Sequence, residues 1–335
     1  MKTIVHTCSS VLVRPNGIVR YINAVMDLQR SLGHHVIFVT DARPTQEIRA
    51  DETIFINLES RYRPNWRDGH VWLQVDRDVA YDVEVAFRRL DVEPDLVVAH
   101  DLHSFLGCED KFRNGIFVQH ESDVYYAGAR YSFLSDEYLQ EQIDTVNTTG
   151  WRIGLNVPTT NVAPYRPVYT PTPFTVVPMP NIEKTRGLLY IGDATERKGA
   201  REFMQVARKL GVTPTVITHE RDAGVFAGAD VHTFGLNDRE AMYELMAQHK
   251  VAYVPSRNEC PGLAALECLQ FMPVVVDGQY AWTSCLADLG VIQARGADIS
   301  AVIDGLLSTS YKPHNRQLLE IWARNNQQLW ANLST

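Results

Sequence analysis

The residues best placed to do chemistry lie between a short apolar run, 251–254, and a helical pattern over 262–271. The backbone N–H groups of Gly262, Leu263 and Ala264 would point out of the N-terminus of that helix, where its partial positive charge lies. Such groups bind phosphate without a basic side chain, and glycine lets the phosphate come close to the backbone. The segment therefore predicts a phosphate-binding turn.

Two carboxylates flank this turn. Glu259 stands in the loop before the helix, and Glu267 lies inside it, between Leu266 and Leu269. A carboxylate among apolar neighbours costs free energy unless hydrogen-bond donors satisfy it. The paired hydroxyls of a ribose would do so, and the structural alternative is a partly exposed helix residue. The spacing therefore favours a nucleotide beside the phosphate turn.

The elements that must position these residues read as a series of buried strands and amphipathic helices. In the second half, strands are predicted at 187–192, 215–218, 231–234, 251–254 and 273–277, with helices over 202–210, 239–249, 262–271 and 314–333. Strands that alternate with helices indicate a parallel sheet, whose ligands bind at the carboxyl ends of the strands.

The first half has the same character. Strands are predicted at 3–8, 35–40, 54–58, 96–99 and 116–119, and helices from Ile18 to Gly33 and over 136–146. A stretch dense in proline and threonine, 158–180, disfavours helix and predicts an extended connector. We therefore expect two doubly wound domains with the ligand in a cleft between them: 1–165, a linker over 166–182, a second domain over 183–312, and a terminal helix, 313–335, that crosses back to the first domain.

Composition restricts the class of protein. The 335 residues are 45% hydrophobic and 21% charged, which is typical of a globular protein. No run approaches the roughly 20 apolar residues of a membrane helix, so a cytoplasmic protein without integral membrane association is expected. The five cysteines form no C-x-x-C pair, which argues against a disulfide framework or zinc ribbon. The net charge of −8 excludes an overall nucleic-acid coat but leaves room for a local basic groove.

The order of motifs resembles family 4-type retaining glycosyltransferases of the GT-B fold. Glu259 and Glu267, with seven residues between them, correspond to the family's glutamate signature. Other segments that resemble the family pattern are Asn16-Gly17, Gly33 to Val36, Pro94 to Asp101, Ile191 to Gly199 and His232 to Gly235. The resemblance implies a nucleotide-sugar donor, with a UDP-sugar preferred, and no required metal or other cofactor.

The resemblance also assigns roles to individual residues. Catalytic contacts to the transferred sugar are assigned to His120 and Glu259, and the donor ribose to Glu267. An imidazole at position 120 could donate a hydrogen bond to a sugar hydroxyl. The remaining assignments are the nucleobase to Phe234 and Gly235, and the donor diphosphate to Gly17, Arg197, Lys198, Gly262, Leu263 and Ala264. Asp193 stands where the family usually has arginine.

The segments 119–122 and 191–199 resemble T-even phage DNA α-glucosyltransferases, which modify 5-hydroxymethylcytosine. A loop that mixes cations with an aromatic ring, Arg61, Arg63, Trp66 and Arg67, is a candidate contact to double-stranded DNA with hydroxymethylated pyrimidines, or else ordinary surface charge. The expected function is transfer of a sugar to such a pyrimidine. Two alternatives stay open: a bacterial transferase that acts on a lipid-linked or small glycan acceptor, and a non-catalytic homologue that binds nucleotide-sugar or DNA.

Overall fold

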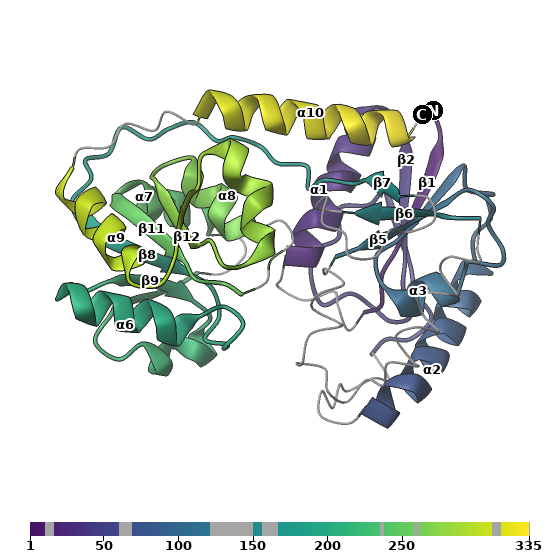
Figure 1. The fold of residues 1–335 in the computed structure, drawn as a ribbon. Coiled ribbons are helices and arrows are strands. Elements are labelled where there is room, and N and C mark those ends of the chain that lie inside the picture. The colour runs from purple at the N-terminus through teal and green to yellow at the C-terminus, as the bar shows by residue number, and fades with distance from the viewer. Residues whose placement is uncertain are drawn as a thin grey trace. The chain divides into compact units, whose positions relative to one another are not determined.

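A computed structural model describes residues 1–10, 17–59, 69–120, 150–155, 167–234, 238–257, 259, 262–309 and 316–334. The chain forms two compact units (Figure 1). The first comprises Met1–Phe174 together with Arg324–Thr335, and the second comprises Thr175–Ala323. The chain therefore passes from one unit to the other inside the proline-rich stretch.

The first unit is built on a parallel sheet whose described strands run in the order β3-β2-β1-β4-β5-β6-β7. The strands are β1 (Thr3–Thr7), β2 (His35–Val39), β3 (Glu52–Ile54), β4 (Leu96–Ala99), β5 (Gly115–Gln119), β6 (Arg152–Leu155) and β7 (Pro167–Tyr169). The described helices are α1 (Gly17–Ser31), α2 (Gly69–Phe87) and the short α3 (Leu102–Leu106). The order reverses at β1, so the carboxyl ends of β1 and β4 mark a topological switch point, where ligands of such folds bind.

The alternation of side chains along β1 explains why helices cover both faces of this sheet. Ile4 packs in one buried cluster with Ile22 and Val25 of α1. Val5, its neighbour in sequence, packs in the other cluster with Val83 of α2. Successive residues of a strand point to opposite faces, so a strand buried on both sides is apolar throughout.

The sequence prediction did not include β6 or α3, and it differs from the structure at two further segments of this unit. The strand expected at 54–58 is Glu52–Ile54, and Asn57 instead makes an isolated bridge to Ala42. The Asn57 side chain donates to the Asp41 carbonyl and to the Asp82 carboxylate, which draws the backbone away from the ladder. The other difference is that part of the expected connector is β7, the edge strand that begins at Pro167. An edge position suits a residue that lacks an N–H donor.

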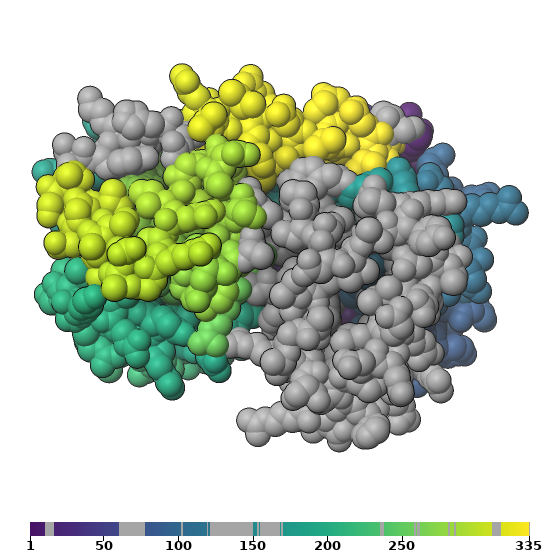
Figure 2. Space-filling view, viewed as in Figure 1, coloured from purple at the N-terminus to yellow at the C-terminus, as the bar shows by residue number. Residues whose placement is uncertain are grey.

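The second unit holds a parallel sheet in the order β10-β9-β8-β11-β12-β13. The strands are β8 (Arg186–Ile191), β9 (Thr215–Thr218), β10 (Asp230–Thr233), β11 (His249–Val254), β12 (Val274–Asp277) and β13 (Ile292–Ala294). The helices are α6 (Ala200–Leu210), α7 (Arg239–Ala247), α8 (Leu263–Leu269) and α9 (Asp298–Ser308), with 3-10 turns η1 (Glu220–Phe226) and η2 (Ala281–Leu289). Figure 2 shows α6 and α9 side by side on the surface of this unit, where both bury apolar residues on one sheet face.

The terminal helix α10 (Arg316–Ser334) has contacts in both units. Near its start, Arg316 donates to the Val177 carbonyl oxygen of the second unit. Near its end, Trp330 is fully buried in the first unit, and its indole N–H donates to the Pro171 carbonyl oxygen. None of the helices in the described ranges has the length and apolarity needed to cross a membrane.

Candidate functional site

Two loops of the second unit meet at the carboxyl edge of its sheet. They follow β8 and β11, which are parallel neighbours, so the loops leave the sheet side by side. The backbone N–H of Arg257 donates to the Arg197 carbonyl oxygen at 2.8 Å. At Gly199 a β-carbon would stand 2.6 Å from the Pro255 carbonyl oxygen, and its φ of +69° is in the left-handed region. Glycine at 199 is therefore what allows the two loops to touch.

An ion pair joins the tips of these loops. Lys198 Nζ donates to Glu259 Oε1 at 2.5 Å, and the two side chains are 19% and 11% exposed. The sequence assigned Lys198 to the donor diphosphate and Glu259 to the sugar, and the structure brings the two together. Because both groups are mostly shielded from water, their attraction is screened less than that of a surface pair.

A second set of charges supports the same junction. The guanidinium of Arg257 donates to Glu196 at 2.5 Å and to Glu202 at 2.6 Å. These carboxylates lie before and inside the first turn of α6. Arg257 therefore holds the loop after β11 against the loop that carries Lys198. The sequence prediction did not include Arg257, because its partners become apparent only when β8 and β11 are known to be neighbours.

Glu267 is buried on α8 and only 2% of its surface is exposed. Its Oε1 accepts a hydrogen bond from the Tyr243 hydroxyl at 3.3 Å, and the Arg239 guanidinium lies 3.7 Å away. Both partners are on α7, and neither was singled out from the sequence. The hydroxyl and the guanidinium therefore give this buried carboxylate two polar partners on α7.

Gly262 is the N-cap residue directly before α8, with φ +81°, and a β-carbon there would lie 2.9 Å from the Trp282 ring. The indole N–H of Trp282 donates to the Ser256 carbonyl oxygen at 2.8 Å. Trp282 therefore packs beneath the turn and fixes its path. Leu263 and Ala264, the first two residues of α8, are half-buried.

The predicted nucleobase contacts lie at the same sheet edge. Phe234 directly follows β10, and its ring stacks on His232 with centroids 6.2 Å apart. Gly235 lies outside the described residues, and so do Arg61, Arg63, Trp66 and Arg67 of the candidate DNA loop. Arg197 is half-buried in the β8 loop, and Gly17 is the exposed first residue of α1 in the first unit.

His120 is the end of a row of polar side chains in the first unit, which we call the histidine chain: Gln29, His6, His100 and His120. Gln29 Oε1 lies 2.7 Å from His6 Nε2, His6 Nδ1 lies 2.8 Å from His100 Nε2, and His100 Nδ1 lies 3.1 Å from His120 Nε2. The three histidines come from β1 and from the positions that follow β4 and β5, which are neighbouring strands.

Burial keeps these imidazoles neutral. It lowers the pKa of His6 to about 4, against the opposing effect of the hydrogen bond that His6 donates to Gln29, and it lowers the pKa of His120 to about 3. The pKa of His100 is lowered well below its ordinary value, first by burial and then by its two histidine neighbours. Tyr21 packs edge-on against His120 and His100, and its hydroxyl donates to the Thr170 carbonyl oxygen. The sequence predicted His120 alone, because the other members of the histidine chain are brought together only in the folded sheet.

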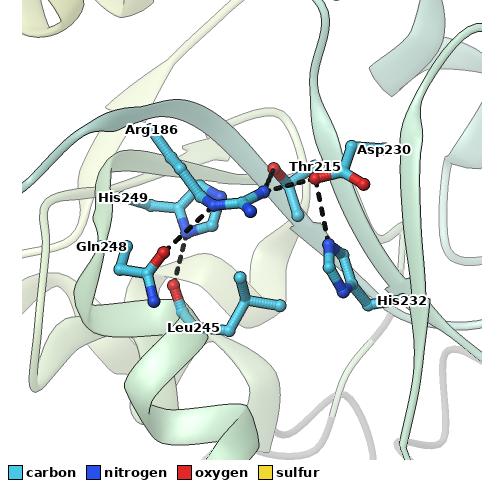
Figure 3. A network of polar contacts seen from close by, with 7 residues as sticks. All are labelled: Arg186, Thr215, Asp230, His232, Leu245, Gln248 and His249. Atoms are coloured by element: carbon cyan, nitrogen blue, oxygen red, sulfur yellow. Dashed lines mark hydrogen bonds and ion pairs between the residues drawn. The ribbon is translucent and has the colours of Figure 1, made fainter.

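A polar network at the opposite, amino edge of the second sheet is structural (Figure 3). Arg186 pairs with Asp230 and donates to Gln248, while His232 also contacts Asp230. Close by, the Lys184 ammonium donates to three backbone carbonyl oxygens, those of Ala247, His249 and Phe271. These groups tie the starts of the strands together, away from the edge where ligands of parallel sheets bind.

Each of the two units is Rossmann-like, with a parallel sheet and polar residues at its carboxyl edge, and two such domains make up the GT-B fold. No protein-family model matches the chain, and no curated protein sequence does. Solved structures do match. A mutant of S. aureus TarM in complex with fondaparinux, alpha-GlcNAc-glycerol and UDP has a TM-score of 0.71 at 10% identity, with 100% of each chain covered.

Two further structures agree with this fold. An alpha,alpha-trehalose-phosphate synthase (UDP-forming) from Burkholderia vietnamiensis matches at TM-score 0.67 and 15% identity, over 100% of this chain and 97% of that one. The pneumococcal O-GlcNAc transferase GtfA in complex with UDP and GlcNAc matches at TM-score 0.63 and 10% identity, over 99% and 97%. At these identities the likeness establishes the fold.

Proposed function

We propose that the protein is a retaining glycosyltransferase that takes its sugar from a UDP-sugar. The observation that carries the proposal is the meeting of Lys198 and Glu259 at the carboxyl edge of the second sheet, just before the helix that holds buried Glu267. A UDP-sugar needs a cation for its diphosphate, a carboxylate near its sugar and a shielded acceptor for its ribose hydroxyls. The UDP complexes among the similar structures support the choice of nucleotide.

In this proposal each group has a separate task. Lys198, with Arg197 and the N–H groups of Gly262, Leu263 and Ala264, neutralises the diphosphate as it leaves. Gly17 contributes a further backbone contact, and Phe234 and Gly235 hold the base. Glu259 and His120 contact the transferred sugar, and the acceptor hydroxyl attacks the anomeric carbon from the face that the diphosphate leaves. The proton of that hydroxyl passes to the departing phosphate oxygen, which balances the reaction.

The proposed acceptor is a 5-hydroxymethylpyrimidine in double-stranded DNA, and the support is the resemblance of 119–122 and 191–199 to phage DNA glucosyltransferases. One observation favours a second candidate, a small glycan or lipid-linked acceptor. The TarM structure holds alpha-GlcNAc-glycerol, and another similar structure is a trehalose-phosphate synthase. Neither candidate requires a membrane-spanning helix.

The direct test incubates the protein with UDP-glucose or UDP-GlcNAc and an acceptor, and follows products by mass spectrometry. Acceptors are duplex DNA with hydroxymethylcytosine, the same duplex with cytosine, glycerol and glucose 6-phosphate. Sugar on the modified duplex alone supports the DNA acceptor, whereas sugar on a small acceptor alone rejects it. Release of UDP without transfer to any acceptor would leave a donor hydrolase, and no UDP release would favour a binding homologue. NMR of the product's anomeric proton tests retention.

Variants connect the reaction to the site. A hydrogen bond to a charged group contributes about 1.5–3 kcal/mol, so Glu267→Gln is expected to weaken UDP binding roughly 10- to 100-fold in calorimetry. Lys198→Met should reduce binding of UDP more than binding of uridine, because only UDP carries the diphosphate. Lys209→Met, which removes an exposed cation at the end of α6, is the matched control. Equal binding by Lys198→Met and the control would exclude the proposed diphosphate contact.

A further inference from the structure

The hydrogen bonds of the histidine chain constrain which nitrogen of each ring carries a proton. Each neutral imidazole has one N–H donor and one nitrogen acceptor. Where two such rings share a hydrogen bond, a proton on one facing nitrogen excludes a proton on the other. His6, His100 and His120 share two such bonds in series, at 2.8 and 3.1 Å. The position of one proton therefore fixes the positions of the other two.

Gln29 decides which arrangement occurs. Its Oε1 faces His6 at 2.7 Å, and its Nε2 donates to the Ser334 hydroxyl oxygen at 3.1 Å. An amide oxygen only accepts, so His6 carries its proton on Nε2. His6 Nδ1 must then accept from His100 Nε2–H, and His100 Nδ1 must accept from His120 Nε2–H. All three rings are therefore Nε2–H tautomers.

The rings are also held in place for this role. His6 and His100 stack with centroids 5.1 Å apart, and His100 and His120 stack at 5.3 Å. Gln29, His6 and His100 are 2% exposed or less, so water does not compete for these hydrogen bonds. Tyr21 closes the side of the row, with its ring centroid 4.7 Å from that of His120.

We propose that Gln29, through His6 and His100, fixes the tautomer of His120, so that His120 meets its ligand with Nδ1 as a hydrogen-bond acceptor for a hydroxyl. Gln29, His6 and His100 are positioning residues in this scheme. The identity of the hydroxyl, that of the transferred sugar, rests on the proposed function, whereas the proton pattern does not. The sequence suggested that His120 donates to the sugar, and the tautomer assigned here reverses that direction at Nδ1.

The pattern can be read directly in the unliganded protein. Long-range proton–nitrogen correlation spectra of protein labelled with 15N-histidine distinguish the two neutral tautomers of each ring at pH 7.5. Loss of a signal in a single-histidine variant assigns it. The expected result is an Nε2–H tautomer at His6, His100 and His120. An Nδ1–H tautomer at any of the three overturns the proposal, and the reverse amide orientation of Gln29 would give Nδ1–H at all of them.

Variants at Gln29 test whether this residue sets the pattern. Gln29→Met keeps the length of the side chain but removes the acceptor, and is expected to give a mixture of tautomers that extends to His120. Gln29→Glu restores an acceptor and should restore Nε2–H at all three rings. Trp151→Phe, which removes a buried N–H donor elsewhere in the unit, is the control for loss of stability and should leave the pattern unchanged. A pure Nε2–H tautomer at His120 in Gln29→Met would show that Gln29 does not control it.

Activity provides a separate readout. If the proposed transfer is found, Gln29→Met should lower kcat about tenfold with little change in the KM for UDP-sugar, and Gln29→Glu should recover most of it. An unchanged kcat in a variant with mixed tautomers would refute the link between the histidine chain and the ligand. If no protein shows transfer but the wild type has the Nε2–H pattern, the proposed function is refuted and the tautomer assignment of the histidine chain is retained.

Discussion

Acid should weaken the first unit through His6, and the structure allows the size of that effect to be calculated. His6 is fully buried, and burial lowers its pKa from 6.5 to about 4. Between these values the unfolded chain takes up a proton that the folded chain does not. Stability due to neutral His6 is therefore complete above pH 6.5 and is lost as the pH falls toward 4.

The magnitude follows from the linkage relation. Each pH unit in this window costs about 1.36 kcal/mol for one such group. At pH 5, about 1.5 units below the unfolded value, His6 alone should remove about 2 kcal/mol from the free energy of unfolding. Replacing it by a residue that does not titrate, His6→Gln, should make the loss between pH 7 and pH 5 smaller by that amount, although the variant is less stable at pH 7.

The free energy of unfolding of the first unit is measured by urea titration at pH 7 and at pH 5. A brief hydrogen-exchange pulse at one fixed pH labels the unfolded protein, and mass spectrometry of peptides from the first unit gives its unfolded fraction. Trp151→Phe is the control, because it disturbs a buried hydrogen bond of the same unit without removing a titrating group. Its pH dependence should equal that of the wild type. If His6→Gln loses as much stability as the wild type on going to pH 5, His6 is not held neutral by burial and the reasoning fails.

Other changes should act through contacts of the second unit, each measured by its unfolding free energy in urea. Gly199→Ala should destabilise the unit by more than the roughly 1–2 kcal/mol expected for a left-handed residue, because the added β-carbon meets the Pro255 carbonyl oxygen. Gly211→Ala is the control, since Gly211 has a similar φ in open space and should show only the backbone strain. Equal losses of stability in the two variants would contradict the contact. Lys184→Met should cost about 1–3 kcal/mol, since three carbonyl oxygens lose their charged donor, and a neutral result would show that water replaces it. Arg257→Met should cost about 1 kcal/mol, less in high salt because the guanidinium is 35% exposed; a salt-independent loss would point to packing instead.

Periodicity predicted most strands of both sheets, because an apolar run such as 96–99, which is β4, needs only local sequence to be recognised. The edge strands were harder. β7 begins at a proline inside a stretch that looked like a connector, and β3 is too short to show a period. What makes them strands is the neighbouring strand, which local sequence does not contain.

The candidate site divides in the same way. The two glutamates, Lys198 and His120 stood out because their types and neighbours in sequence suggested chemistry. Arg257 and Gln29 did not, because an arginine in a loop and a glutamine on a helix are ordinary. Their partners lie 55 and 23 residues away in sequence. The pairing of β8 with β11 brings Arg257 to Glu202, and the packing of α1 on β1 brings Gln29 to His6.

The contact at Gly199 limits how the proposed donor site can change. The loop after β8 and the loop after β11 touch through backbone atoms, so neither can be lengthened or redirected without moving the other. Replacing one loop alone with the corresponding loop of a protein of the same fold would create a mismatch at this junction. Any redesign of the proposed donor site should therefore replace residues 192–199 and 255–259 together.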